Sequence, residues 1–277
     1  MSISYFSILV DKVFSKSEIL LEVTDHEVHY PEELKRHIEE VWRIAQNRGR
    51  VFTGPMSRLF GFKLINSKLK LILGSTNYKE FVGTRTGEIF QKYGAKYLAN
   101  PLAICSVIST TDKVILISKR SGVESRPGFY HVVGGYLDPY RHCDSKGLPD
   151  PFKAITTEIL EETGIKEHNI KDIICLGLVY DTVLFHPELT FYTEVTLSFP
   201  EIIRLCPLEK ETEKMECIPD APQPIIDFVM LHHKEMAPTG LANIILYLKY
   251  KHRKIITELN LPHVCESDPT KHLLETT

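Results

Sequence analysis

The sequence predicts an α/β protein, because runs with strand character alternate with helical patterns along the chain. Residues 102–109 and 113–119 are strongly apolar and flank a polar turn, which predicts a hairpin. Residues 173–182 and 189–197 predict a second antiparallel strand pair, and a helical pattern over 154–165 lies between the two pairs. Such an order of elements is typical of a sheet covered by helices.

Composition excludes several classes of protein. With 277 residues and 43% hydrophobic content, the chain is long enough to bury a sizeable core. A net charge of −3 argues against a broad nucleic-acid surface, which needs a basic excess. The six cysteines form no CxxC pair, so we expect reduced thiols in a cytoplasmic protein. No apolar run approaches 18 residues, so we expect neither a secretion signal nor a membrane span.

Residues 1–98 are predicted to form a small α+β domain of their own. Its helix begins at Pro31 and ends at Gly49, with Leu34, Ile38, Val41, Trp42 and Ala45 at helical spacing. Trp42 on that stripe is expected to pack in the core. The other predicted elements are strands at 3–10 and 19–23, a hairpin of 60–65 and 69–74 around Asn66-Ser67, and short helices at 75–85 and 88–93.

Residues 99–257 are predicted to form the main domain, followed by a loosely packed tail at 258–277. Besides the two strand pairs, the sequence predicts a short strand at 130–133 that ends in Gly134-Gly135. A polar excursion rich in Pro and Gly separates these glycines from the helix at 154–165. The remaining predicted elements are an edge strand at 214–218 and helices at 225–233 and 241–252.

The helix at 154–165 carries three carboxylates on one face, those of Glu158, Glu161 and Glu162. Like charges repel there, so the arrangement favours a bound cation or solvent over a purely structural role. Ile155, Ile159 and Leu160 are expected to hold the opposite side against the core, and Gly164 to end the helix in left-handed backbone. Oxygen ligands on one helix face suit Mg²⁺, which keeps several waters and shares substrate phosphates.

Together with the preceding strand and Gly-Gly turn, the stretch Glu158-Ile-Leu-Glu-Glu-Thr-Gly-Ile165 resembles the second half of the Nudix hydrolase signature. The resemblance implies an α/β/α sandwich with a mixed sheet, and dependence on Mg²⁺ with Mn²⁺ as the alternative ion. It also implies that Glu158 and Glu162 are the main metal ligands, that Glu161 is a ligand or a base, and that the carbonyl of Gly134 completes the site.

The sequence departs from the signature in two places. Gly135 precedes Glu158 by 23 positions, eight more than in the family, and Thr157 stands where the family has an arginine that orients the carboxylates. We expect Lys153 or Arg141 to take over that orienting role. The acid of the signature's loop has three candidate replacements, and a later metal-binding acid has three more; these are Asp138, Asp144 and Asp150, and Glu188, Glu194 and Glu201.

Four further stretches resemble the UDP-sugar diphosphatase branch of the family, which has an extra N-terminal domain. They are residues 75–84, 97–102, 119–121 and 134–139. This resemblance implies that a small nucleotide sugar, UDP-glucose or UDP-galactose, is split into UMP and sugar 1-phosphate. Two alternatives stay open: an ADP-ribose or other dinucleotide pyrophosphatase, and a Nudix-fold module that senses nucleotides without turnover.

Five residues are predicted to bind the substrate: Arg120, Tyr78, Phe81, Arg85 and Tyr136. Arg120 ends a strand where a guanidinium could clamp phosphate, with a surface salt bridge as the equal alternative. Tyr78 and Phe81 in isolation are more typical of packing. Arg126 is expected to be solvated, His131 to face either the site or the sheet, and His232-His233 to form no joint metal site because neighbours on a helix point apart.

Overall fold

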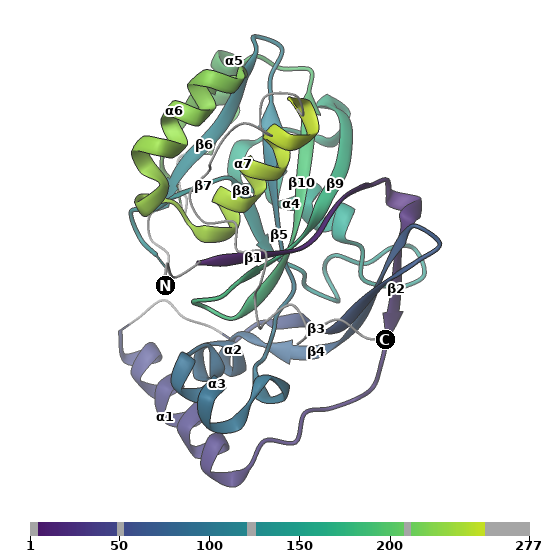
Figure 1. Ribbon diagram of the computed structural model, residues 1–277, viewed down its shortest axis with the longest axis vertical. Helices are drawn as coiled ribbons and strands as arrows, with labels where there is room; N and C mark the ends of the chain where they lie inside the picture. Colours follow the sequence, from purple (N-terminus) through teal and green to yellow (C-terminus); the bar gives the residue numbers. More distant parts are fainter. Residues whose placement is uncertain (1–4, 49–52, 121–125, 208–211, 253–277) are drawn as a thin grey trace.

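The computed structural model describes residues 5–48, 53–120, 126–207 and 212–252 (Figure 1). Its larger sheet has the strand order β1-β9-β10-β5-β6-β11, with β7 beside β6 and β8 beside β5. Only β5 and β10 run parallel within this sheet, so the sheet is mixed. The strands are β1 (Phe6–Phe14), β5 (Ala103–Ser109), β6 (Val114–Arg120), β7 (Tyr130–His131), β8 (Val133–Tyr136), β9 (Ile170–Asp181), β10 (His186–Val195) and β11 (Thr212–Pro219).

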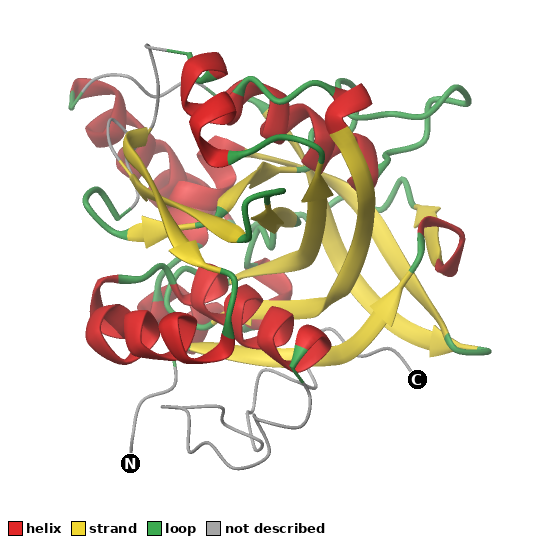
Figure 2. Cartoon of the chain, turned by 90° about the horizontal axis from the view of Figure 1, so that it is seen from above, coloured by secondary structure: helices red, strands yellow, loops and turns green. Residues whose placement is uncertain are grey.

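Helices cover both faces of the larger sheet, because alternate residues of each strand supply two separate cores. Ile104 of β5 packs in one core with Ile155 and Ile159 of α4 (Pro151–Thr163) and with α5 (Phe199–Leu205). Its neighbour Cys105 packs in the other core with α6 (Pro222–His232) and α7 (Pro238–Lys251). Figure 2 shows the strands lying between these helices, which confirms the predicted α/β/α sandwich.

A smaller sheet of order β2-β4-β3 lies beside the larger one, at the bottom of Figure 1. It contains β2 (Ile19–Val23), β3 (Pro55–Ile65) and β4 (Lys68–Asn77), and it is accompanied by α1 (Glu32–Asn47), α2 (Tyr78–Thr84) and α3 (Gly87–Tyr93). Asn66 and Ser67 both have positive φ, as the predicted two-residue hairpin requires. The remaining helices are single 3₁₀ turns at Lys16–Glu18, Ala95–Tyr97, Glu167–Asn169 and His233–Glu235.

The helical stripe of α1 is confirmed as a packing surface. Leu34 and Ile38 join the main core, whereas Trp42 packs with Ala45 and Val82 in a small cluster. Trp42 is only 7% exposed, so packing is its role, as its spacing predicts. The predicted helix end at Gly49 and the tail at 258–277 lie outside the described residues.

The first strand overlaps the predicted range of 3–10, but it belongs to a different sheet from the one expected. β1 extends from Phe6 to Phe14 and pairs with β9 at the edge of the larger sheet, although it was expected in the N-terminal α+β domain. Ser57 of β3 also joins the smaller sheet to residues next to β8 and β5. Its backbone N–H donates to the carbonyl of Leu137, and its carbonyl accepts from the backbone N–H of Leu102, both at 2.8 Å. The domain boundary at residue 98 stays a prediction, but β1, which precedes it in the chain, belongs to the sheet formed by residues that follow it.

Candidate functional site

The acidic helix α4 has capping groups at both ends. Asp150 is its N-cap and accepts hydrogen bonds from the backbone N–H groups of Phe152 (3.0 Å) and Lys153 (3.2 Å). Gly164 ends it with a φ of 74°, the left-handed exit that the sequence predicts. Ile155 and Ile159 are fully buried, but the prediction for Leu160 is wrong, because that side chain is 45% exposed.

The predicted turn at Gly134-Gly135 is wrong, because both glycines lie within β8 and pair with Cys105 and Ile104 of β5. Two of the three carboxylates lie against these glycines. The backbone N–H of Gly134 donates to Oε1 of Glu162 at 3.0 Å. At Gly135 there is no room for a side chain, because an added Cβ would lie 2.4 Å from the carboxylate of Glu158. Gly135 therefore lets the acidic face of α4 approach the strand this closely, whereas a side chain at Gly134 would meet the neighbouring strand β5.

The third carboxylate, that of Glu161, forms an ion pair with Arg141 in the enlarged loop. It is therefore directed toward the loop, while Glu158 and Glu162 face the glycines of β8. Within the described ranges, no group of three or more His, Cys, Asp or Glu side chains is arranged to hold a metal ion. Of the three predicted carboxylate ligands, two thus lie at β8 and the third is held to one side.

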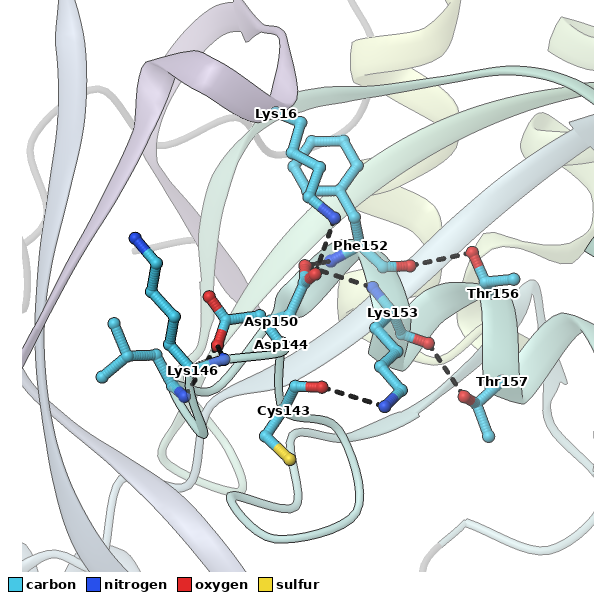
Figure 3. A network of polar contacts seen from close by, with 10 residues as sticks. Lys16, Cys143, Asp144, Lys146, Asp150, Phe152, Lys153, Thr156 and Thr157 are labelled. Carbon is cyan, nitrogen blue, oxygen red and sulfur yellow. Dashed lines mark hydrogen bonds and ion pairs between the residues drawn. The ribbon is translucent and has the colours of Figure 1, made fainter.

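Thr157, in the position where an arginine was expected, does not replace it. Its Oγ1 donates to the carbonyl of Lys153, one turn back along the helix, at 2.9 Å (Figure 3). Lys153 itself is directed to the carbonyl of Cys143, to which its Nζ donates at 2.9 Å. Of the two cations expected to orient the carboxylates, Arg141 therefore contacts one of them, and Lys153 is bonded to the loop.

The three acids of the enlarged loop are all used to shape it. Asp138 accepts from the backbone of Tyr140 and Arg141 at 2.8 and 3.0 Å. Asp144 accepts from the backbone of Lys146 and Leu148 at 2.8 and 3.0 Å. Asp150 caps α4 and is also bonded to Lys16 at 2.6 Å, so a residue close to β1 holds the start of the acidic helix (Figure 3). These contacts give all three acids structural roles.

The later acids that could bind metal have separate surroundings. Glu194 pairs with Lys171 at 2.8 Å, and Glu201 belongs to the capping box of α5. Glu188 is 3% exposed and lies 3.4 Å from Nε2 of His186. Burial alone would raise the pKa of Glu188, but the hydrogen bond from His186 and the nearby His131 lower it to about 2. Glu188 also interacts with Cys105, whose sulfur accepts from Asn243 of α7, so it faces the α7 side of the sheet.

Four of the five predicted substrate-binding residues lie together near the end of β8. Burial raises the pKa of Tyr136, and the neighbouring Tyr78 raises it further, whereas Arg85 and Arg120 oppose the rise. All four side chains are half-buried. Nε of Arg120 is buried and has no hydrogen-bond partner among the described residues. A phosphate oxygen would satisfy such a donor, since guanidinium and phosphate match in charge and shape.

The fifth predicted residue, Phe81, is in the core. It is fully buried, and its ring lies 5.6 Å from Tyr136, 5.7 Å from His186 and 6.2 Å from Tyr78. The guanidinium of Arg85 lies over the same ring at 5.1 Å. The prediction that Phe81 contacts a ligand is contradicted by its burial, because it has no surface to offer. Phe81 instead supports the side chains around it.

Arg126 was expected to be solvated, and this is wrong. Its guanidinium pairs with the fully buried Asp181 through Nη1 at 2.5 Å and Nη2 at 3.3 Å. His131, whose direction was left open, is buried against Gly240 of α7. Burial and Arg120 lower its pKa to about 4. His232 is bonded to Glu235, while His233 is bonded to the carbonyl of Met230, so they share no site.

The five cysteines in the described part of the chain are free, as predicted, and Cys265 lies outside it. The described residues include no helix with the length and apolar character needed to span a membrane.

Curated proteins with sequences similar to this chain include two that are named as follows. Nudix hydrolase 9 of Arabidopsis thaliana is 26% identical over 207 residues, which cover 62% of this chain and 67% of the relative. The chain is therefore similar in sequence to a Nudix hydrolase. Another Nudix relative, the uridine diphosphate glucose pyrophosphatase NUDT22 of Bos taurus, is 28% identical over 182 residues, covering 56% of this chain. The matched part spans 63% of the bovine protein, less than two thirds of its length. The predicted resemblance to the UDP-sugar branch of Nudix proteins is thereby confirmed.

No family model matches the chain. Among solved structures, the chain is similar to the Nudix domain of Shewanella oneidensis NrtR in complex with ADP ribose. Their sequence identity is 16% and the TM-score is 0.41, over 59% of this chain and 96% of that one. A Nudix hydrolase from Nitrosomonas europaea is 18% identical with a TM-score of 0.39, over 54% and 89% of the two chains.

Proposed function

We propose that this protein is a cytoplasmic, Mg²⁺-dependent hydrolase that splits UDP-glucose or UDP-galactose into UMP and sugar 1-phosphate. The observation that carries the proposal is the pair of carboxylates on α4, Glu158 and Glu162, packed against two glycines of β8 at which a side chain would clash. A purely structural helix has no use for two like charges at that position. The name of the bovine relative supports the choice of a UDP-sugar.

The donor set of this site fits a hard divalent cation. Mg²⁺ prefers oxygen ligands, and it is commonly bound through one or two carboxylates, with waters and substrate phosphates in the other positions. Glu158 and Glu162 would hold the ion, with the carbonyl of Gly134 as the third predicted donor. When bound, the ion would polarise the phosphoryl group and lower the pKa of a bound water. Glu161, paired with Arg141, stands beside these ligands.

The nucleotide would lie toward the side chains gathered around Tyr136. Arg120 and Arg85 bring two positive charges into a half-buried setting, where they interact more strongly with phosphate oxygens than at an exposed site. Tyr78 and Tyr136 offer aromatic faces for a uracil ring, and the ring of Phe81 packs edge-to-face against both of them. Positioning of the diphosphate and neutralisation of its charge are the main tasks in such a reaction.

A product assay tests this proposal. The protein is incubated with UDP-glucose, UDP-galactose and ADP-ribose, each in Mg²⁺ and in excess chelator, and the products are separated by chromatography. We expect UMP and sugar 1-phosphate from the UDP-sugars in Mg²⁺ only. AMP from ADP-ribose without UMP would support the dinucleotide alternative, and calorimetric binding of nucleotide without any product would support the sensing module. Either result would overturn the proposal.

A further inference from the structure

The enlarged loop at 139–150 brings a cation to the acidic helix, and this cation is Arg141. The loop is anchored at both ends. The carboxylate of Asp138 fixes the backbone N–H of Arg141 at 3.0 Å, and the carbonyl of the next residue, His142, accepts from the N–H of Asp150 at 2.6 Å. His142 is only 2% exposed. The Arg141 side chain therefore starts from a fixed point next to α4.

From that point the guanidinium reaches Glu161 and forms the ion pair described above. This contact contributes little to the stability of the fold. The side chains of Arg141 and Glu161 are 54% and 40% exposed, and exposed pairs typically contribute less than about 1 kcal/mol. The position of the pair is more informative, because Glu161 lies next to Glu162 in the chain and one turn from Glu158.

We infer that Arg141 is a positioning residue of the acidic helix: it holds Glu161 toward the loop and so leaves Glu158 and Glu162 as the ordered pair at the glycines of β8. The inference rests on the proposed function in that the acidic face is taken to bind a divalent ion. Position 157 lies one turn before Glu161 on the same helix face, and Thr157 there is bonded to the helix backbone instead. The enlarged loop thus supplies from a distance the guanidinium that the helix lacks.

Binding of Mn²⁺ to the nucleotide-free protein, measured by electron paramagnetic resonance, tests the role of Arg141 independently of turnover. Removal of a group that orients metal ligands typically costs 10- to 100-fold in affinity, so we expect Arg141→Ala to raise the Mn²⁺ dissociation constant about tenfold. If Arg141 acted only as a nearby positive charge, its removal would tighten cation binding. If it were an ordinary surface partner, affinity would not change. Either of these outcomes overturns the inference.

Three further variants sharpen the test. Lys146→Ala removes one positive charge from the same loop, and its ammonium points away from α4 in Figure 3, so Mn²⁺ affinity should be unchanged. In a Glu161→Gln background, Arg141→Ala should have no additional effect, because Arg141 acts through that carboxylate. Thr157→Arg combined with Arg141→Ala should recover at least part of the lost affinity. An additional loss in the Glu161→Gln background would show that Arg141 acts by another route.

Thermal unfolding of each variant keeps the test interpretable. Because the pair is exposed, Arg141→Ala should leave the melting temperature within about 2 °C of the unchanged protein. A loss of Mn²⁺ affinity at constant melting temperature supports positioning, whereas a loss that parallels unfolding contradicts it. If the product assay finds no hydrolysis, the Mn²⁺ measurement still decides whether Arg141 orders the site, so the two proposals fail separately.

Discussion

At the scale of single residues, the two carboxylates at β8 have neighbours that distinguish them from ordinary surface acids. Glu162 accepts a hydrogen bond from the backbone of Gly134, and Glu158 fills the space in which a side chain at Gly135 would lie. Glu162 is thus held by a backbone group, and Glu158 lies directly against the backbone of β8. Charge at these positions is expected to matter for turnover and to matter little for folding.

Glu162→Gln is expected to abolish turnover and to leave thermal stability unchanged or raised. The amide oxygen of glutamine can still accept from Gly134, while the substitution removes a negative charge that repels Glu158 and Glu161. Initial rates with UDP-glucose and a thermal melt are the two measurements. The exposed Glu167→Gln is the matched control and should change neither. Full activity of Glu162→Gln would contradict the assignment of this ligand.

Arg126→Met is expected to destabilise the fold by about 3 kcal/mol, because it leaves the carboxylate of Asp181 buried without its charge partner. Urea unfolding at neutral pH measures the change. Lys35→Met removes a cation from the exposed pair with Glu32 and should change the free energy of unfolding by less than about 0.5 kcal/mol. Equal effects of the two substitutions would show that burial of the Arg126 pair is energetically unimportant.

At the scale of elements, α4 and β8 form one unit, because Gly135 lets the strand approach the acidic face of the helix. The helix itself could be predicted from sequence, since the spacing of Glu158, Glu161 and Glu162 and the stop at Gly164 are local features. The sequence could only narrow the cation that contacts Glu161 to two candidates, Lys153 and Arg141, because the contact depends on the path of an irregular loop. The prediction that Phe81 binds the substrate is wrong for a similar reason, because the burial of a side chain depends on which distant elements cover it.

Gly135→Ala is expected to displace the carboxylate of Glu158 and to reduce kcat at least tenfold, as for other losses of metal-ligand orientation. The added methyl group would meet that carboxylate at 2.4 Å, so the side chain of Glu158 or the strand must shift. Gly87→Ala at the start of α3 is the control, because open space surrounds that position. Steady-state kinetics with UDP-glucose compare the two variants. Equal activity would show that the close approach of β8 and α4 is unnecessary.

At the scale of the whole molecule, the sheet collects side chains from distant parts of the chain. Glu188 of β10 lies beside Ala103 of β5, which in turn lies beside Tyr136 of β8. This register brings the buried carboxylate of Glu188, the ring of Tyr136 and His131 to one side of the sheet. The sequence predicted these strands, but the parallel pairing of β5 with β10 could not be read from local patterns, because it joins residues far apart in the chain.

Stability is expected to fall when the pH drops from about 6.5 toward 4. The pKa of His131 is lowered to about 4 in the folded protein, chiefly by burial, whereas its ordinary value is 6.5. Between these values the unfolded chain takes up a proton and the folded protein does not, so unfolding is favoured by up to about 3 kcal/mol. Urea unfolding across this pH range should show a shallower slope for His131→Asn. An unchanged slope would contradict the role of His131.

The place of β1 has a consequence for how the chain folds. Phe6 pairs with Asp181, which lies 175 residues later, so the edge of the larger sheet cannot form until most of the chain has been synthesised. Contacts between residues so far apart in sequence are slow to form. Until β1 arrives, β9 presents an open strand edge, which can pair with other chains. We therefore expect nascent chains of this protein to depend on chaperones until the first strand closes the sheet.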